Sequence, residues 1–178
     1  MIRAVSVSAF ENEGSWGPAC TVLGQLTGRW ALERSIDGLG SMRGEASFEP
    51  ASDDWVHYGE EGELRLENGQ RFVATRRYRY RGLPAGFAVF FSEAPARLFH
   101  EVSLVRGSDG ELRGAARHLC AHDLYLTDYL FTPDGQFCVR HRVRGPRKDF
   151  TISTRYRRVQ MQGSREAAQV GRPCRAGG

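Results

Sequence analysis

From residue 28 to residue 159, apolar and polar side chains alternate in short runs that are separated by turn residues. A period of two is typical of a β-strand that buries one face. The turns include Asn68-Gly69 and Asp109-Gly110, and such pairs favour tight hairpins. The pattern predicts ten strands, at 29–36, 41–49, 55–66, 71–82, 86–92, 97–105, 112–121, 123–131, 136–144 and 149–159. Consecutive strands joined by tight turns indicate an all-β protein, a single up-and-down antiparallel barrel.

This barrel domain is expected to span residues 26–160. Gly17 and Pro18 interrupt the preceding segment, which indicates an arm over residues 1–25 with a short helix from Ala19 to Leu26. Residues 161–178 are polar and Gly-rich, so we expect a disordered tail there. A chain of 178 residues suits one domain with a sizeable core.

Several predicted strands carry charged or imidazole groups on their apolar face. In 97–105, for example, His100 shares a face with Leu98 and Val102. A buried charge is costly unless it is paired, so such groups must form ion pairs or line a hydrated interior. Strands 86–92 and 123–131 are apolar on both faces, which leaves their orientation undecided. The polar groups predicted to face inward are Arg34, Glu60, Arg76, Tyr78, His100, His118, His141 and Tyr156.

The densest group of chemically active side chains lies in residues 117–125. As one continuous strand, this segment would place His118 and Cys120 on the face opposite Asp123 and Tyr125. A β-bulge near Ala121 or His122 would shift the register by one residue and bring all four onto one face.

Composition and charge narrow the classes of partner. The net charge of +4 and the pI near 9.1 are modest for a nucleic-acid-binding protein, so nucleic acid is not the expected partner. No apolar run reaches the roughly 18–20 residues needed to span a bilayer, and the first ten residues make a poor signal peptide. We therefore expect a cytoplasmic protein without a membrane partner. The four cysteines show no metal-binding spacing and are expected to be free thiols.

Gly28-Arg29-Trp30 opens the first predicted strand, and Tyr156-Arg157-Arg158 closes the last. This resembles the lipocalin (calycin) pattern, in which a first-strand Trp packs against an Arg of the last strand; Trp30 and Arg158 are the matching positions. The resemblance covers Leu26 to Val159 and implies a calycin-like barrel, but no activity. Other segments are similar to an uncharacterised family of intracellular lipocalin-like barrels: Glu60-Glu61-Gly62, Ala74-Thr75-Arg76-Arg77-Tyr78, Phe99-His100, His118-Leu119-Cys120, Asp123-Leu124-Tyr125 and Gly145-Pro146-Arg147-Lys148-Asp149.

The main functional hypothesis is an interior site for a small polar or anionic organic molecule. Arg34 and Arg76 would grip a carboxylate or phosphate. His118 and Asp123 would form a proton-transfer pair, suited to cofactor-free isomerisation, cyclisation, elimination or hydrolysis. Glu60 joins them as a third catalytic candidate. The other candidate ligand-binding residues are Tyr58, Tyr78, His100, Tyr125, His141, Lys148 and Tyr156.

Four alternatives stay open at this point. Arg34, Arg76 and Glu60 could form a purely structural ion-pair network, or the barrel could carry a ligand without turnover. A haem or transition metal could bind His100, His118 or His141 with Cys120, although no cofactor is the expectation. The outward arginines, including Arg77 and Arg79, could bind RNA or pair with outward Glu45, Glu61, Glu63 and Glu101. A homodimer is also left open.

Overall fold

The computed structural model describes residues 16–52 and 54–159. The predicted tail and most of the predicted arm lie outside these residues. A 3-10 turn at Ala19–Thr21 leads into the one α-helix of the described chain, α1 (Val22–Leu26), where the sequence predicts a short helix. The strands are β1 (Gly28–Ile36), β2 (Gly40–Pro50), β3 (Trp55–Leu66), β4 (Arg71–Leu83), β5 (Gly86–Phe91), β6 (Leu98–Arg106), β7 (Leu112–Cys120), β8 (Asp123–Phe131), β9 (Phe137–Gly145) and β10 (Lys148–Arg158).

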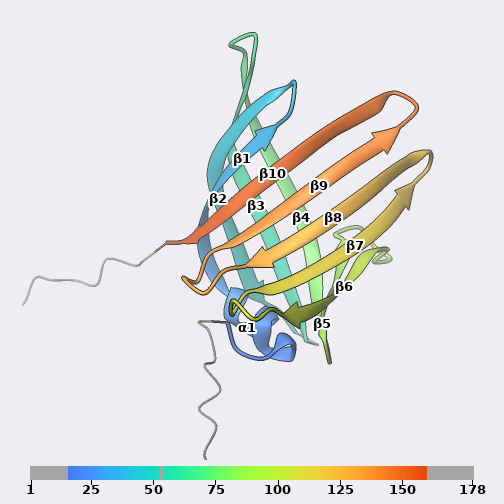
Figure 1. Ribbon diagram of the computed structural model, residues 1–178. Coiled ribbons are helices and arrows are strands. Elements are labelled where there is room, and N and C mark those ends of the chain that lie inside the picture. The colour runs from blue at the N-terminus through green and yellow to red at the C-terminus, as the bar shows by residue number, and fades with distance from the viewer. Residues whose placement is uncertain (1–15, 53, 160–178) are drawn as a thin grey trace, which may run out of the picture.

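Every strand pairs with its neighbour in sequence, and β1 also pairs with β10, which closes the sheet into a ten-stranded antiparallel barrel (Figure 1). The predicted fold class is therefore confirmed, with strand boundaries within about one residue of those expected from the pattern. The hairpin turns contain Gly38, Gly69, Gly110 and Gly135 at φ between 66° and 86°. Only glycine adopts this left-handed conformation without a steric penalty, which explains why the turn signals are reliable.

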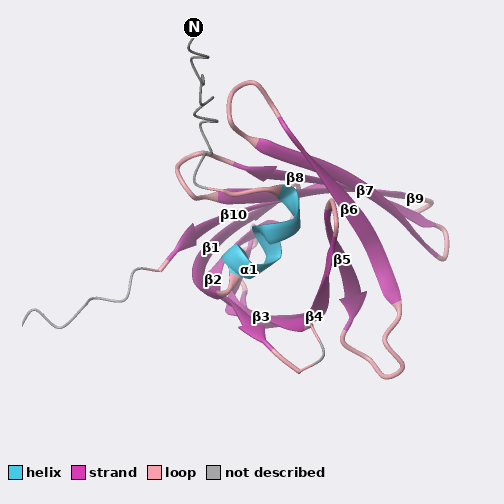
Figure 2. Cartoon of the chain, turned by 90° about the horizontal axis from the view of Figure 1, so that it is seen from below, coloured by secondary structure: helices cyan, strands magenta, loops and turns pink. Residues whose placement is uncertain are grey.

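One end of the barrel is covered by α1, which lies across the opening (Figure 2). A dense group of buried aromatic side chains fills the barrel beneath it. Trp30 is fully buried, donates a hydrogen bond from Nε1 to the Leu26 carbonyl oxygen (2.8 Å), and packs edge-on against Phe137 at 4.9 Å. The Arg158 guanidinium lies 4.3 Å from the Trp30 ring centroid, and its NH1 donates to the Thr27 carbonyl oxygen. Trp30 and Arg158 thus make the contact that the lipocalin resemblance implies. No described helix is long enough to cross a membrane.

The opposite end is open. There the inward-facing side chains are partly exposed, in contrast to the buried aromatics beside α1. The side chain of Arg76 is 38% exposed and Phe72, nearer the β3–β4 turn, is 50% exposed. Because these residues point into the barrel yet contact solvent, the interior is accessible from this end, where the hairpins project in Figure 1.

Two local predictions need correction. In β6, a register shift opposite Val89 and Phe90 places both Phe99 and His100 in the interior, whereas Leu98 is 43% exposed. A β-bulge has this effect because it places an extra residue on one strand of the pair. The sequence pattern had assigned Leu98 to the inward face.

The segment 117–125 is not one continuous strand either. It is the β7–β8 hairpin, with a two-residue turn at Ala121 and His122, and Ala121 has a φ of 53°. His118 pairs with Tyr125, and Cys120 pairs with Asp123. Directly opposed residues of antiparallel strands share a face. These four side chains therefore face the same way, through a turn and not through a bulge.

Candidate functional site

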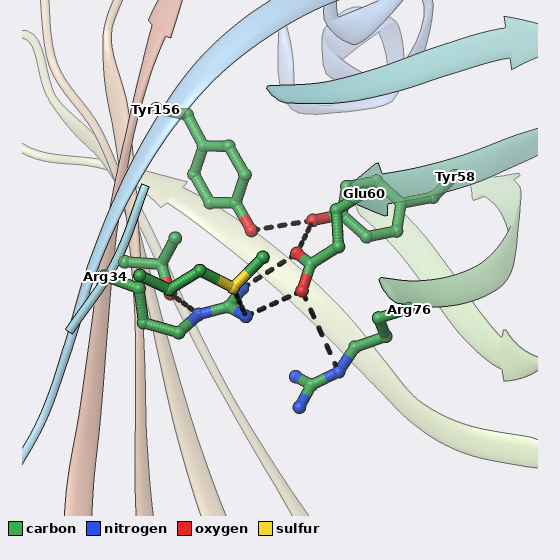
Figure 3. Close-up of polar contacts among 7 residues, drawn as sticks. Arg34, Tyr58, Glu60, Arg76 and Tyr156 are labelled. Carbon is green, nitrogen blue, oxygen red and sulfur yellow. Dashed lines mark hydrogen bonds and ion pairs between the residues drawn. The ribbon is translucent and has the colours of Figure 1, made fainter. Parts of the chain in front are cut away.

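A buried ion pair lies in the middle of the barrel interior. Arg34 on β1 donates from NH1 and NH2 to the two carboxylate oxygens of Glu60 on β3, at 2.6 and 2.7 Å (Figure 3). Its Nε donates to Thr154 Oγ1 on β10 at 2.8 Å. Both charged side chains are almost fully buried, so this two-point contact compensates their loss of hydration.

Two tyrosines extend the ion pair. Tyr58 donates a short hydrogen bond to Glu60 Oε2, and its hydroxyl lies 2.9 Å from that of Tyr156. Burial raises the pKa of Tyr58 well above its usual value, so its hydroxyl keeps the proton that it donates. Burial also opposes the charge of Glu60, but the bonds from Arg34 and Tyr58 outweigh it and lower the pKa of the carboxyl group. Glu60 is therefore a satisfied carboxylate and is poorly placed to act as a base.

Arg76 on β4 is the incomplete member of this group. Its Nε lies 3.9 Å from Glu60 Oε1, beyond hydrogen-bonding distance, and its guanidinium makes no hydrogen bond within the described chain. The terminal nitrogens point away from Glu60 in Figure 3. Arg34 and Arg76 carry two positive charges against the single negative charge of Glu60. One positive charge therefore remains in the accessible part of the interior.

Two further histidines face the interior, and one of them, His141, lies near the Arg76 charge. His100 Nε2 lies 2.8 Å from the Tyr129 hydroxyl, and His141 Nδ1 lies 2.9 Å from Thr127 Oγ1. Burial, and then the neighbouring histidines, lower the pKa of His100 to about 3. Burial, and then Arg76 and Arg34, lower the pKa of His141 to about 4. Both imidazoles are neutral at pH 7 and can exchange hydrogen bonds without adding charge.

His118 completes the cluster at the open end. Its ring lies 4.9 Å from Phe99 and 5.8 Å from Phe91, in edge-on contacts, and its buried Nε2 has no hydrogen-bond partner. Tyr78 stacks parallel to Phe99 with ring centroids 5.7 Å apart. A buried polar atom without a partner is uncommon, and such an atom marks a position where a water molecule or a ligand can bind. The arrangement is a set of flat apolar walls with two open imidazole nitrogens, His118 Nε2 and His100 Nδ1.

The predicted His118–Asp123 pair does not form. Asp123 accepts a hydrogen bond from Lys148 Nζ at 2.5 Å, at the rim of the open end. The glycine at position 145 makes room for this contact, because a Cβ atom there would collide with the Asp123 carboxylate. The contact between Asp123 and Lys148 therefore joins the start of β8 to the start of β10. Cys120, beside them, is exposed.

The predicted site residues thus fall into three groups. The first is the ion-pair network, the second is the imidazole and aromatic cluster, and the third is the rim contact. The ion-pair network contains Arg34, Tyr58, Glu60, Arg76 and Tyr156. The imidazole and aromatic cluster contains Tyr78, His100, His118, Tyr125 and His141. The rim contact joins Asp123 and Lys148. Sequence reasoning missed Phe99, which the bulge turns inward. It also missed Thr127 and Tyr129, because strand 123–131 is apolar on both faces.

The predicted pairing of outward arginines with outward glutamates is found in part. Glu45 pairs with Arg29, and Glu63 lies 3.4 Å from Arg65 and 3.6 Å from Arg71. Arg79 stacks on Trp55, with its guanidinium carbon 4.2 Å from the ring centroid. A groove of about 790 Å³ crosses the outside of β1, β2, β9 and β10. Within it, Glu33 opposes Arg43 and Arg155 on the neighbouring strands. Alternating charges favour a solvated surface over a phosphate-binding stripe.

No group of three metal-binding side chains occurs among residues 16–52 and 54–159. The haem or metal alternative therefore gains no support from the described residues. What the interior offers is one unmatched guanidinium, neutral imidazoles, tyrosine hydroxyls and flat apolar walls. Such a set can hold an anionic group, accept or donate hydrogen bonds, and enclose a planar hydrocarbon.

Comparison with known proteins places the chain in a family without assigning it a function. No curated protein matches it. Among solved structures, the redesigned β-barrel mFAP1 bound to DFHBI is 11% identical, covers 76% of this chain and 97% of its own, and has a TM-score of 0.35. The structure of EF1p2_mFAP2b bound to DFHBI is 12% identical, covers 79% and 99%, and has a TM-score of 0.40. A family model matches residues 26–158, and the chain accordingly belongs to the family of unknown function DUF6314.

Proposed function

We propose that this protein binds a small anionic organic molecule inside its barrel, with Arg76 as the anchoring cation. The observation that carries the proposal is the Arg76 guanidinium, which faces inward, is 38% exposed, and has only a 3.9 Å contact to its counter-ion. Charge-assisted hydrogen bonds to a carboxylate, sulfonate or phosphate would complete it. The molecule would enter from the open end, and the tyrosines and phenylalanines would enclose its apolar part.

The aromatic walls narrow the class of ligand further. Tyr78, Phe91 and Phe99 present ring faces and edges within about 6 Å of one another, next to the His118 ring. Such surfaces favour a planar or aromatic body through stacking and edge contacts. His118 and His141 would exchange hydrogen bonds with its polar substituents. An aromatic carboxylate or sulfonate has all of these features.

The experiment uses 8-anilinonaphthalene-1-sulfonate, a planar aromatic anion whose fluorescence rises on binding. Arg76→Gln should weaken its binding by about tenfold to a hundredfold, since a hydrogen bond to a charged group contributes about 1.5–3 kcal/mol. Arg77→Gln is the matched control, because Arg77 is the next residue on β4 and faces outward. Equal affinity for wild type and Arg76→Gln would refute the anchoring role. Native mass spectrometry of the purified protein would identify any co-purifying ligand.

Acid–base chemistry at His118 is a second candidate, favoured by its buried and unpartnered Nε2. The catalytic pair of the sequence prediction is not needed, because the imidazole alone can move a proton. Deuterium uptake from D₂O into the co-purifying molecule would report such chemistry, and it should be absent in His118→Gln. Uptake that continues in that variant would exclude His118 as the base. A carrier without turnover, the cytoplasmic location and calycin-type ancestry stay predictions.

A further inference from the structure

The large apolar side chains that are exposed gather at one end of the barrel. Six such residues in the described chain are at least 43% exposed. Five lie on turns and strand ends around the open end, which we call the rim: Leu39 (46%), Phe72 (50%), Val73 (77%), Leu98 (43%) and Leu119 (67%). The sixth, Val105 (69%), lies on β6 near the opposite, closed end. Exposed apolar side chains gathered in this way mark an interaction surface.

The rim residues come from four separate hairpins. Leu39 lies in the β1–β2 turn, Phe72 and Val73 begin β4, Leu98 begins β6, and Leu119 precedes the β7–β8 turn. In Figure 1 these hairpins spread outward around the opening, with the β5–β6 link lower than the other three. A partner that contacts all of them must be broad and must accept apolar groups at several separate points. A bilayer surface meets this requirement, whereas a single helix or strand does not.

Arginines accompany the apolar rim residues along the chain. Arg71 precedes Phe72, Arg97 precedes Leu98, and Arg117 is two residues before Leu119. Apolar groups that enter the acyl region beside guanidinium groups at the headgroup level are typical of interfacial membrane binding. Arg71 lies 3.6 Å from Glu63 and Arg97 lies 2.8 Å from Glu93, whereas Arg117 has no ion pair within the described chain. In a rim-to-rim dimer of this chain, Arg117 would be buried without a phosphate to pair with. The sequence of the rim therefore favours lipid over a second copy.

From these observations we infer that the rim docks on a bilayer containing anionic phospholipid, with the apolar rim residues inserted and the barrel mouth facing the lipid. Docked in this way, the interior site receives its ligand from the membrane surface and not from bulk water. An amphiphilic anion that partitions into membranes is then the class of ligand that reaches Arg76. This last step rests on the proposed interior site, whereas the docking itself does not.

The test is co-sedimentation of the full chain with phosphatidylcholine vesicles, with and without phosphatidylglycerol. Wild type should bind the anionic vesicles, and salt should weaken the binding. Val73→Asp and Leu119→Asp should each lower the vesicle affinity by about tenfold, because they place a charge in the interface. Val105→Asp is the matched control, since it adds the same charge at an equally exposed valine outside the rim, and it should bind like wild type.

Several results would overturn the inference. Absence of wild-type binding to anionic vesicles would do so, and so would equal losses in Val73→Asp and Val105→Asp. Sedimentation velocity without vesicles separates the dimer alternative: a dimer that Leu119→Asp dissociates would assign the rim to a second copy. Arg76→Gln should bind vesicles like wild type, because Arg76 lies inside the barrel. If Arg76→Gln loses dye binding but keeps vesicle binding, the loss therefore concerns the interior site alone and not the docking.

Discussion

Glu60 accepts hydrogen bonds from Arg34 and Tyr58 and lies 3.9 Å from Arg76. It is therefore the only carboxylate of the described chain that faces both of these interior arginines. Without it, Arg34 would keep its charge in a site where its side chain is 6% exposed. An unpaired buried charge is far more costly than the loss of a surface ion pair, so the stability of the barrel should depend strongly on this residue.

Glu60→Gln should lower the free energy of unfolding by about 3–5 kcal/mol, the usual loss when one partner of a buried ion pair is removed. Urea denaturation would measure it. Glu61→Gln is the control, because Glu61 is the next residue on β3 and points outward, and its effect should stay within about 0.5 kcal/mol. The double variant Arg34→Met/Glu60→Leu should lose less than Glu60→Gln alone. Similar small losses for Glu60→Gln and Glu61→Gln would contradict the conclusion that the stability of the barrel depends strongly on the Arg34–Glu60 ion pair.

A second prediction concerns His141 and the pH dependence of folding stability. Its pKa is about 4 in the folded protein, mainly because of burial, against about 6.5 when unfolded. Between these values the unfolded chain binds a proton that the folded protein does not. Its contribution therefore disfavours folding as the pH falls from about 6.5 to about 4, by up to about 1.4 kcal/mol per pH unit. His141→Gln should remove that part of the pH dependence.

Urea denaturation at pH 4.5, 5.5 and 6.5 would measure the difference between variant and wild type. His141→Gln should gain stability relative to wild type as the pH is lowered across this range. The lowered pKa of Glu60 affects both proteins in the same way and so cancels in this difference. His57→Gln, at an exposed position on the outer wall, should run parallel to wild type. A constant difference between His141→Gln and wild type at all three pH values would show that His141 is not held neutral.

The inward position of Arg34, Glu60 and Arg76 follows from strand periodicity, because residues two apart share a face. Their partners do not follow from it. Asp123 was expected to pair with His118, yet it contacts Lys148, which is 25 residues away on β10. Which of several nearby groups forms an ion pair depends on side-chain reach and on small features such as the missing side chain at Gly145. These are set by the folded barrel and leave no periodic signal.

At the scale of whole strands, β2 and β3 approach each other closely at a pair of glycines. Gly44 and Gly62 are opposite each other and face the interior. A Cβ atom at Gly44 would collide with the Glu61 carbonyl oxygen and lie 2.5 Å from the Gly62 Cα. These atoms belong to the backbone and cannot rotate away. The two glycines therefore set the distance between β2 and β3, the strand that carries Glu60.

Gly44→Ala should destabilise the protein by about 1–3 kcal/mol, the usual cost of overpacking. Gly59→Ala provides the control within the same strand pair, because its Cβ would lie 3.8 Å from the nearest other atom, Ser47 Oγ. Alanine there restricts the unfolded chain and should be neutral or stabilise by up to about 1 kcal/mol. Thermal denaturation of both variants would test this. If Gly44→Ala were as stable as Gly59→Ala, the result would contradict a close approach of β2 and β3 at Gly44.

Most of the strands were predictable because apolar and polar residues alternate within them and turn residues lie between them. The bulge between β5 and β6 was not predictable, since strand 86–92 is apolar on both faces and its sequence shows no change of face. This bulge turns Phe99 inward, where it forms a wall of the candidate site. Between β7 and β8 the sequence predicted a break between strands 112–121 and 123–131 but not the turn itself, because Ala121 and His122 are not typical turn residues.

At the scale of the whole molecule, the barrel has two ends of different character. The end beside α1 contains stacked and edge-on rings, including the Phe137–Tyr156 pair at 4.2 Å and the fully buried Phe131. The other end keeps its polar groups and an accessible interior. Burial and contact density are concentrated where no ligand is needed, and the open end is left free to admit one. A site that binds small molecules is expected on the less densely packed part of a fold.

Amide hydrogen exchange should follow this division within single strands. Toward the open end the backbone pairing is incomplete, because β7 pairs with β6 over Leu112–Ala115 alone and β4 pairs with β5 over Tyr78–Leu83 alone. Faster exchange there should therefore reflect both unpaired amides and easier local opening. Peptides covering residues 28–33 and 137–141, beside α1, should exchange about tenfold or more slowly than peptides covering 67–73 and 117–123 at the rim. Mass spectrometry of a deuterium time course would measure both in one sample. Uniform protection along the strands would mean that the barrel opens only as a unit, and access to Arg76 would then require global unfolding and not local motion of the rim.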